Sequence, residues 1–209
     1  MTNAVLSRGC ALVLFATVYA CGGQTRPAEG PAPAPRPAQA VAPMDLGGQK
    51  VLVLPVQIAA GVGEPRDEVT REVLFALGER DSRSEWIGPD RLRAALQRAP
   101  GYAPDPGVLP SDAYRHHQQR YVIEPLAGVL RRYSALMDVR LVLIPQSAVW
   151  LPSPGGGGTV RMAAVMIDAR TGNVVWYGEA DGAAAPEPGR PAVATAAAAL
   201  AARLVVTRG

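Results

Sequence analysis

Few side chains in this chain of 209 residues have the types and spacing that catalysis or metal binding requires. The only two histidines, His116 and His117, are adjacent, so on a helix they point about 100° apart and cannot share a metal as an i, i+4 pair does. A Ser-His-Asp triad would lack the Gly-x-Ser-x-Gly turn that presents such a serine. We interpret both histidines as part of a solvated helix face, and we expect no catalytic residue, no metal and no cofactor.

Four consecutive glycines, Gly155–Gly158, are the second candidate for chemistry. A glycine-rich loop can cradle a phosphate when a helix follows at once, because the amino-terminal N–H groups of that helix then face the ligand. Here Thr159–Asp168 follows, which has the pattern of a strand, and no Lys-Ser/Thr pair comes after the glycines. This pattern is typical of a flexible hairpin loop.

The amino terminus has the layout of a secretory signal. One positive charge, Arg8, precedes residues 10–20, which are apolar and uncharged. This run is too short for a mature transmembrane helix, which needs about 20 residues, and it fits the apolar region of a signal peptide. We therefore assign residues 1–20 to a signal peptide that is removed.

The residues that end this apolar run decide the role of Cys21. The sequence Val18-Tyr19-Ala20-Cys21 resembles the bacterial lipobox, although Tyr19 is bulkier than the usual residue there. By that resemblance Cys21 becomes the first mature residue and carries the acyl chains that hold a protein to a membrane. The alternative is ordinary cleavage after Ala20, which leaves a free thiol. A disulfide has no partner, because Cys10 lies in the segment to be removed.

Composition divides the rest of the chain into a tether and one domain. Residues 21–48 are rich in Pro, Ala and Gly and have too few large apolar side chains to offset the entropy of ordering, so we expect a disordered linker. Residues 49–209 are long enough for a single globular domain.

The net charge is +3, but arginines alternate with acidic residues and form no basic run, which argues against nucleic acid as a partner.

Periodicity within 49–209 predicts strands and helices in mixed order. We expect a central strand, a helix, a short strand that runs into a helix, a proline-rich loop, a further helix, a long strand, a hairpin and a closing helix. Their expected positions are Lys50–Gln57, Arg66–Arg80, Ser84–Asp90, residues 99–110, a helix from Ser111 or Asp112 through His117, a helix from Pro125, Val139–Trp150, Thr159–Asp168 with Val174–Ala180, and Pro191–Val206. The fold class is an α/β (α+β) sandwich, with a mixed sheet of about four to five strands and helices packed on it.

Four phrases of this pattern together resemble a known group of domains. They are VLVLPV, WIGPDRLRAAL, the helix end Ala135–Arg140 that leads into Leu141–Pro145, and the turn Asp168–Gly172. Over residues 50–206 the order of elements is similar to the TolB amino-terminal, CsgG-like and LpoB-like domains of bacterial envelope lipoproteins. The resemblance offers no catalytic residues to carry over. The transmembrane barrel of a curli-type channel needs long amphipathic hairpins with about 9–11 residues per strand, and the loops of this sequence are too short or too rich in Pro and Gly to supply them.

These observations lead to one expectation of function. The chain would be a lipid-anchored, non-enzymatic binding, scaffold or regulatory module that docks another envelope protein through a sheet edge or the proline-rich loop at 99–110. Gly22, rather than Asp, follows Cys21, which favours the periplasmic face of the outer membrane. The alternatives are an envelope hydrolase that uses His116 or His117, and a subunit of a curli-type secretion assembly.

Overall fold

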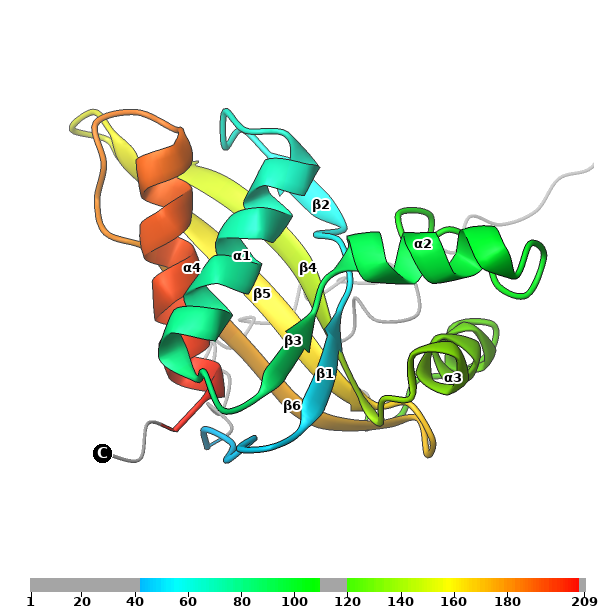
Figure 1. The fold of residues 1–209 in the computed structure, drawn as a ribbon. Coiled ribbons are helices and arrows are strands. Elements are labelled where there is room, and N and C mark those ends of the chain that lie inside the picture. Colours follow the sequence, from blue (N-terminus) through cyan, green and yellow to red (C-terminus); the bar gives the residue numbers. More distant parts are fainter. Residues whose placement is uncertain (1–41, 110–119, 207–209) are drawn as a thin grey trace, which may run out of the picture. The chain divides into compact units, whose positions relative to one another are not determined.

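The computed structural model describes residues 42–109 and 120–206 (Figure 1). Cys21, His116 and His117, together with the helix expected from Ser111 or Asp112, lie outside these ranges. The described elements are β1 (Lys50–Val53), β2 (Ile58–Ala60), α1 (Arg66–Arg80), β3 (Glu85–Ile87), α2 (Pro89–Arg98), α3 (Leu126–Met137), β4 (Leu141–Pro152), β5 (Gly158–Asp168), β6 (Asn173–Asp181) and α4 (Arg190–Leu204).

The strands form one mixed sheet in the order β3-β1-β4-β5-β6, with β2 paired to β4. Strand β1 is parallel to both β3 and β4, whereas β4, β5 and β6 form an antiparallel meander. This arrangement confirms the predicted fold class and the central position of the first strand. The sheet has six strands, one more than the upper expected number, because the short strand β2 was not predicted. Strand β1 also ends at Val53, before the expected Gln57, near Pro55, which has no N–H to donate.

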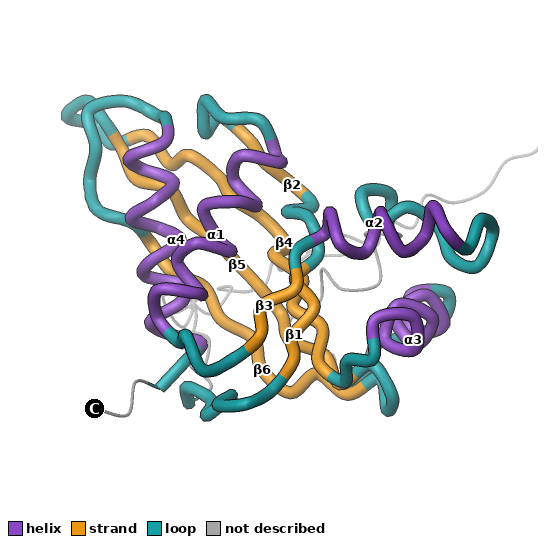
Figure 2. Tube along the Cα trace, viewed as in Figure 1, coloured by secondary structure: helices purple, strands orange, loops and turns teal. Residues whose placement is uncertain are grey.

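Helices cover both faces of the sheet (Figures 1 and 2). Helices α1 and α4 lie side by side over one face, where Val53, Leu143 and Met166 are among the buried sheet residues. Helix α3 packs on the other face, where Val142 and Ile144 belong to a second buried cluster together with α2 residues. No helix in the described part of the chain is long and apolar enough to cross a membrane.

Helix α1 matches its predicted bounds and contains one buried polar residue that joins it to the sheet. Val69, Val73 and Leu77 are buried, as their helical spacing implies, and Thr70 is buried beside them. The Thr70 hydroxyl donates to the Arg66 carbonyl (2.7 Å) and accepts the N–H of Val56 (3.1 Å). Because Thr70 satisfies its own hydroxyl and a buried backbone group at once, it can be buried without a desolvation penalty.

The predicted turn and bulge of the meander are both present. Gly172 has a φ of 76° in the turn between β5 and β6, a conformation that glycine adopts at no steric cost. Asp168 fixes this turn, because its carboxylate accepts the N–H groups of Arg170 (3.0 Å) and Thr171 (3.3 Å). A proline within the expected strand Val139–Trp150 predicts either a bulge or an edge location. The register of β4 with β5 shifts between Pro145 and Ser147, so the structure has the bulge.

Ordered packing begins within the stretch that composition assigns to the linker. The side chain of Leu46 is 1% exposed and belongs to the core cluster under α1 and α4. Met44 pairs in parallel with Val205, its N–H donating to the Leu204 carbonyl (2.7 Å) and its carbonyl accepting the N–H of Val206 (3.1 Å). The chain therefore joins the fold beside the end of α4, at the same end of the sheet as the start of β1.

Candidate docking site

Most of the residues that the sequence offers for chemistry are not among those that the structure describes. Cys21, His116 and His117 lie outside the described residues. Among residues 42–109 and 120–206, no group of three His, Cys, Asp or Glu side chains is placed to hold a metal ion. Gly155 to Gly157 form the turn between β4 and β5, and Gly158 begins β5, so the glycine run is a hairpin loop, as predicted.

Two buried carboxylates are held ionised by arginine and by hydrogen bonds. Burial by itself would raise the pKa of Asp168, but the hydrogen bond from Arg140 (2.7 Å) and two backbone N–H groups outweigh it, so its pKa lies below the usual value. Burial also opposes ionisation of Asp81, and hydrogen bonds from Ser84 and Arg83 again lower its pKa. Such carboxylates fix neighbouring elements, and neither has the raised pKa of a general acid.

The proline-rich loop, one of the two docking routes expected from the sequence, is fastened to α3. The Tyr133 hydroxyl donates to the Pro104 carbonyl (2.8 Å), and the ring is fully buried. Burial, with a smaller contribution from nearby Asp105, raises the pKa of Tyr133, so this donor keeps its proton at every physiological pH. Tyr102 and Val108 remain exposed on the loop.

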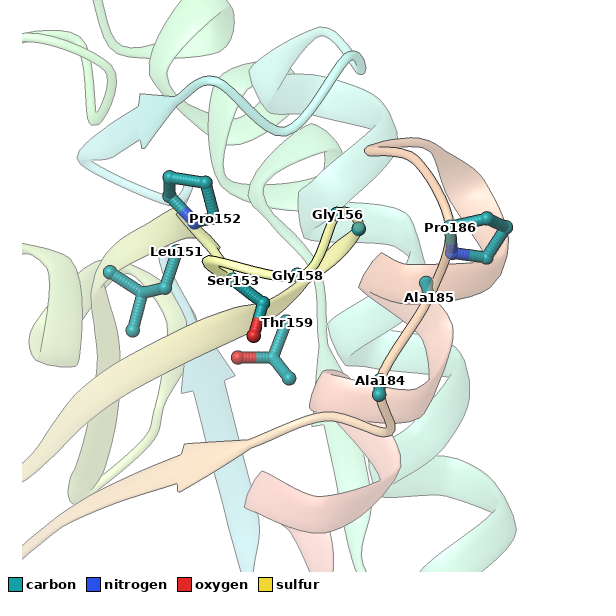
Figure 3. Close-up of a pocket in the computed structure, with 10 residues that line it drawn as sticks. Leu151, Pro152, Ser153, Gly156, Gly158, Thr159, Ala184, Ala185 and Pro186 are labelled. Atoms are coloured by element: carbon teal, nitrogen blue, oxygen red, sulfur yellow. The ribbon is translucent and has the colours of Figure 1, made fainter.

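A hollow lies at the tip of the β4–β5 hairpin (Figure 3). It has a volume of about 590 Å³ and is open to solvent. Three segments line it: the end of β4 (Leu151–Ser153), the glycine turn with the start of β5 (Gly156–Thr159), and the loop that leads to α4 (Ala184–Pro186). Volumes of this order are typical of ligand-binding clefts.

Close backbone contacts build this hollow, and they explain two of the four glycines. Gly158 and Ala185 exchange N–H to carbonyl hydrogen bonds of 2.9 and 2.8 Å, which fasten the α4 loop to the hairpin. A Cβ on Gly157 would lie 2.4 Å from the Ala185 carbonyl oxygen, and one on Gly158 would lie 2.4 Å from the Leu151 carbonyl oxygen. By contrast, a Cβ on Gly155 would meet no atom within 4 Å. Gly157 and Gly158 are therefore required for the close backbone approach that shapes the hollow.

The lining fits an uncharged chain segment better than a charged small molecule. None of its side chains is ionisable, and its side-chain polar groups are the hydroxyls of Ser153 and Thr159. Leu151, Pro152, Pro186 and the alanines supply apolar surface. A phosphate would meet no arginine or lysine among these residues, so the arrangement disfavours the phosphate cradle that the glycine run could otherwise indicate.

The hollow and the point where the chain joins the fold lie at opposite ends of the sheet. Val51 pairs with Leu141 at the first end, and Pro152 pairs with Gly158 at the other. Eleven residue steps along β4, at about 3.3 Å each, separate these ends by roughly 36 Å. Helix α4 spans the same direction, since its first turn follows the hollow and its last turn precedes the pairing of Val205 with Met44.

Sequence inspection could find the hairpin but not the hollow. The glycine run and the flanking strands predict the turn, whereas the third wall comes from Ala184–Pro186, which is distant in sequence and has no motif. The one available signal was the number of consecutive glycines, because a simple hairpin turn needs only one or two. A run of four indicates that another backbone approaches closely.

No family model matches the chain, and no curated protein matches it. Among solved structures, the LpoB C-terminal domain from Salmonella enterica is 17% identical, with a TM-score of 0.42 over 69% of this chain and 86% of that chain. The PelC dodecamer from Paraburkholderia phytofirmans is 13% identical, with a TM-score of 0.42 over 79% of this chain and 96% of that chain. The lipoprotein GNA1162 from Neisseria meningitidis is 13% identical, with a TM-score of 0.40 over 69% and 90% of the two chains. The LpoB-like resemblance predicted from the order of elements is thus confirmed at low identity, and it carries no argument about function.

Proposed function

We propose that the chain is a lipid-anchored, non-enzymatic docking module of the bacterial cell envelope, which binds or regulates another envelope protein. Cys21 is the proposed site of lipid attachment, supported by the apolar run before it and the lipobox-like residues Val18–Cys21. Gly22 after the cysteine supports an address on the periplasmic face of the outer membrane. The linker between Cys21 and the fold is then the tether that lets the domain reach its partner.

The hollow at the β4–β5 hairpin is the observation that carries the docking function. It lies at the end of the sheet opposite Met44, so a tethered domain can direct it away from the anchor. Its apolar walls and the hydroxyls of Ser153 and Thr159 fit an extended, uncharged segment of a partner protein. The apolar contacts supply affinity, and the few polar groups fix the orientation of the bound segment.

The lipid anchor is tested by metabolic labelling with a palmitate analogue. The wild-type chain is expected to take up the label and to fractionate with membranes, because two or more acyl chains hold a protein stably. The Cys21→Ser variant should lose both properties. Labelling of Cys21→Ser at the wild-type level would disprove the proposed attachment site, whatever the outcome for docking.

The docking site is tested by photo-crosslinking in intact cells. A photoreactive residue at Ser153 should form an adduct with one envelope protein, identified by mass spectrometry, and the same residue at exposed Arg71 on α1 should not. Adding Gly157→Ala should abolish the adduct, since its Cβ would lie 2.4 Å from the Ala185 carbonyl oxygen and would displace the loop that leads to α4. Gly155→Ala is the matched control, because its Cβ meets no neighbour.

Two results of this experiment would contradict the proposal. The first is an adduct from Ser153 that persists unchanged with Gly157→Ala while circular dichroism shows the intact fold. The second is loss of the adduct when His116 and His117 are both replaced by alanine, which would favour the hydrolase alternative. The proposal expects the double histidine variant to crosslink like the wild type.

A further inference from the structure

The turn between β5 and β6 is the centre of a second exposed surface. The Val122 N–H donates to the Gly172 carbonyl (2.8 Å), and Tyr121 forms an antiparallel bridge with Asn173, so residues 120–124 lie beside this turn. The end of α3 also borders the turn, across a hollow of about 380 Å³ (Figure 1). The exposed residues of three segments are here called the turn surface: Arg120–Glu124, Arg131–Arg140 and Asp168–Gly172.

Two large apolar side chains are exposed on the turn surface. Tyr121 is 61% exposed and Ile123 is 58% exposed, whereas Val122 between them is 7% exposed. Because successive side chains of an extended segment alternate between its two faces, Tyr121 and Ile123 point to the same side, away from the core. Exposed apolar side chains are common on protein surfaces, so the charges around this pair decide what it can contact.

Arginine predominates among the charged side chains of the turn surface. Its three segments contain five arginines and three carboxylates. Each carboxylate already contacts a cation, and the pairs are Glu124 with Arg131, Asp168 with Arg140 (2.7 Å) and Asp138 with Lys50 (3.7 Å). The other arginines are exposed and form no ion pair with any described residue; they are Arg120, Arg132 and Arg170.

The fold brings these arginines together, although they lie in separate segments and form no basic run in the sequence. Arg170 and Arg131 line the same hollow at the end of α3. The pKa of Glu124 lies below its usual value because this carboxylate accepts hydrogen bonds from Arg131 and from the N–H of Gly128 (2.9 Å), and the charge of Arg132 adds to the effect. Arg132 is therefore also close to this part of the surface.

We propose that the turn surface binds the anionic headgroup layer of the membrane that holds the lipid anchor. Tyr121 and Ile123 enter the interface between headgroups and acyl chains, where tyrosine is enriched. Arg120, Arg132 and Arg170 contact the phosphates of the headgroups. Binding to such a layer increases with the buried apolar area and with the electrostatic attraction, and the turn surface supplies both.

The position of the turn surface favours the membrane over an acidic protein as its partner. Leu141 pairs with both Val51 and Asp168, so the turn lies at the end of the sheet where β1 starts. The chain joins the fold at this same end, through the pairing of Met44. The inference rests on the proposed lipid anchor, because the anchor is what brings this end to a membrane. The hollow at the β4–β5 hairpin then faces away from the lipid.

Because of the tether, a weak contact is sufficient. Near an anionic membrane each arginine contributes about a fivefold factor in affinity, so three contribute on the order of 100-fold. Residues 22–41 can reach up to about 60 Å when a proline-rich chain is extended, at about 3.1 Å per residue. The anchored domain therefore stays close to the headgroups at a high effective concentration. Salt weakens the contact, since the charges involved are exposed.

A fluorophore at position 123 tests the contact in the full chain, extracted from cell membranes and reconstituted on vesicles. Ile123→Cys is labelled with an environment-sensitive maleimide, and the wild type gives the background from its own cysteines. On vesicles of phosphatidylcholine with phosphatidylglycerol, the emission should shift to the blue, and lipids with brominated acyl chains should quench it. On phosphatidylcholine alone, or at high salt, both effects should be severalfold smaller. The same label on Gly155→Cys, at the other end of the sheet, should respond to neither vesicle.

Paired substitutions in the labelled Ile123→Cys chain identify the arginines. Arg120→Gln with Arg170→Gln should lower the ratio of bound to unbound domain by about 25-fold, because two arginines are lost. Arg71→Gln with Arg190→Gln is the matched control, since it removes the same charge from exposed positions on α1 and α4, and the ratio should change far less. All four side chains are exposed, so the melting temperatures should match that of the parent.

Flotation of the same samples with neutral vesicles separates this inference from the anchor. A chain that does not float there contradicts the acyl anchor, yet its label still reports whether anionic vesicles bind the turn surface. Equal emission on neutral and anionic vesicles, or equal losses from the two pairs of substitutions, would overturn the proposal. A label that no vesicle shields but that an acidic envelope protein does would also overturn it, and would assign the surface to a protein partner.

Discussion

Leu46 provides a direct test of where the tether ends and the folded domain begins. Composition places this residue in the linker, yet its side chain is 1% exposed within the core. Its carbonyl accepts hydrogen bonds from the Ser84 hydroxyl (2.6 Å) and from the N–H of Gln49 (2.9 Å). We predict that Leu46→Ala destabilises the whole domain, although the substitution lies before the first strand.

The size of the effect follows from the burial of Leu46. Replacing a fully buried leucine by alanine costs about 3 kcal/mol, the sum of the lost transfer free energy and the cavity that remains. For a domain of this size, 1 kcal/mol lowers the melting temperature by roughly 2–4 °C. Leu46→Ala should therefore lower the melting temperature by about 6–12 °C, and a chain that begins at residue 49 should lose at least as much.

Thermal and urea unfolding monitored by circular dichroism measure this difference. Pro43→Ala is the control, because Pro43 is an exposed neighbour in the same segment, and its effect should be within about 0.5 kcal/mol. If Leu46→Ala and Pro43→Ala unfold at the same temperature, residue 46 belongs to the tether in solution. The packing argument for an early start of the domain would then be wrong.

Three further predictions follow from buried polar groups and close contacts. Because Arg140 and backbone N–H groups lower the pKa of Asp168 despite its burial, its stabilising contribution is complete above the pKa of the unfolded chain, about 4, and is lost progressively as the pH falls from there through the lower pKa of the folded state. Urea unfolding between pH 7 and pH 3 should show the onset of this loss, and Arg140→Gln should flatten the pH dependence. Trp176 is fully buried, and its indole N–H has no partner among the described residues. Trp176→Phe therefore removes an unsatisfied donor and should cost less than about 1.5 kcal/mol, against about 3–5 kcal/mol for Trp176→Ala; equal costs would show that the N–H is satisfied in solution. A Cβ on Gly178 would lie 2.4 Å from the Trp176 ring, so Gly178→Ala should destabilise the wild type more than the Trp176→Phe variant, as a double-mutant cycle can measure.

The order of elements could be predicted from the sequence because each element has a strong local signal. Helix α1 follows from apolar residues at helical spacing, and the β5–β6 turn follows from Gly172, whose positive φ only a few residue types tolerate. Pro145 correctly indicated a bulge. Strand β2 (Ile58–Ala60) was missed, because a strand of only three residues carries too little pattern to be distinguished from a loop.

The surfaces were harder to predict, because they depend on contacts between distant segments. Leu46 has no periodic neighbours that would assign it to the core, and only the fold brings α1, α4 and β1 around it. The hollow needs Ala184–Pro186 beside the hairpin, which no local pattern implies.

If the chain is anchored to a membrane as proposed, the parallel pairing of Met44 with Val205 has a mechanical consequence. Any pull on the tether reaches the domain first at Met44, through its two hydrogen bonds of 2.7 and 3.1 Å. The two hydrogen bonds of this single pairing break at a lower force than the hydrogen bonds of the sheet. The packing of the buried Leu46 side chain is lost next. Release of residues 42–48 would lengthen the tether by up to about 24 Å before any strand bears the load. The Met44–Val205 pairing would therefore protect the sheet by allowing a small, reversible extension.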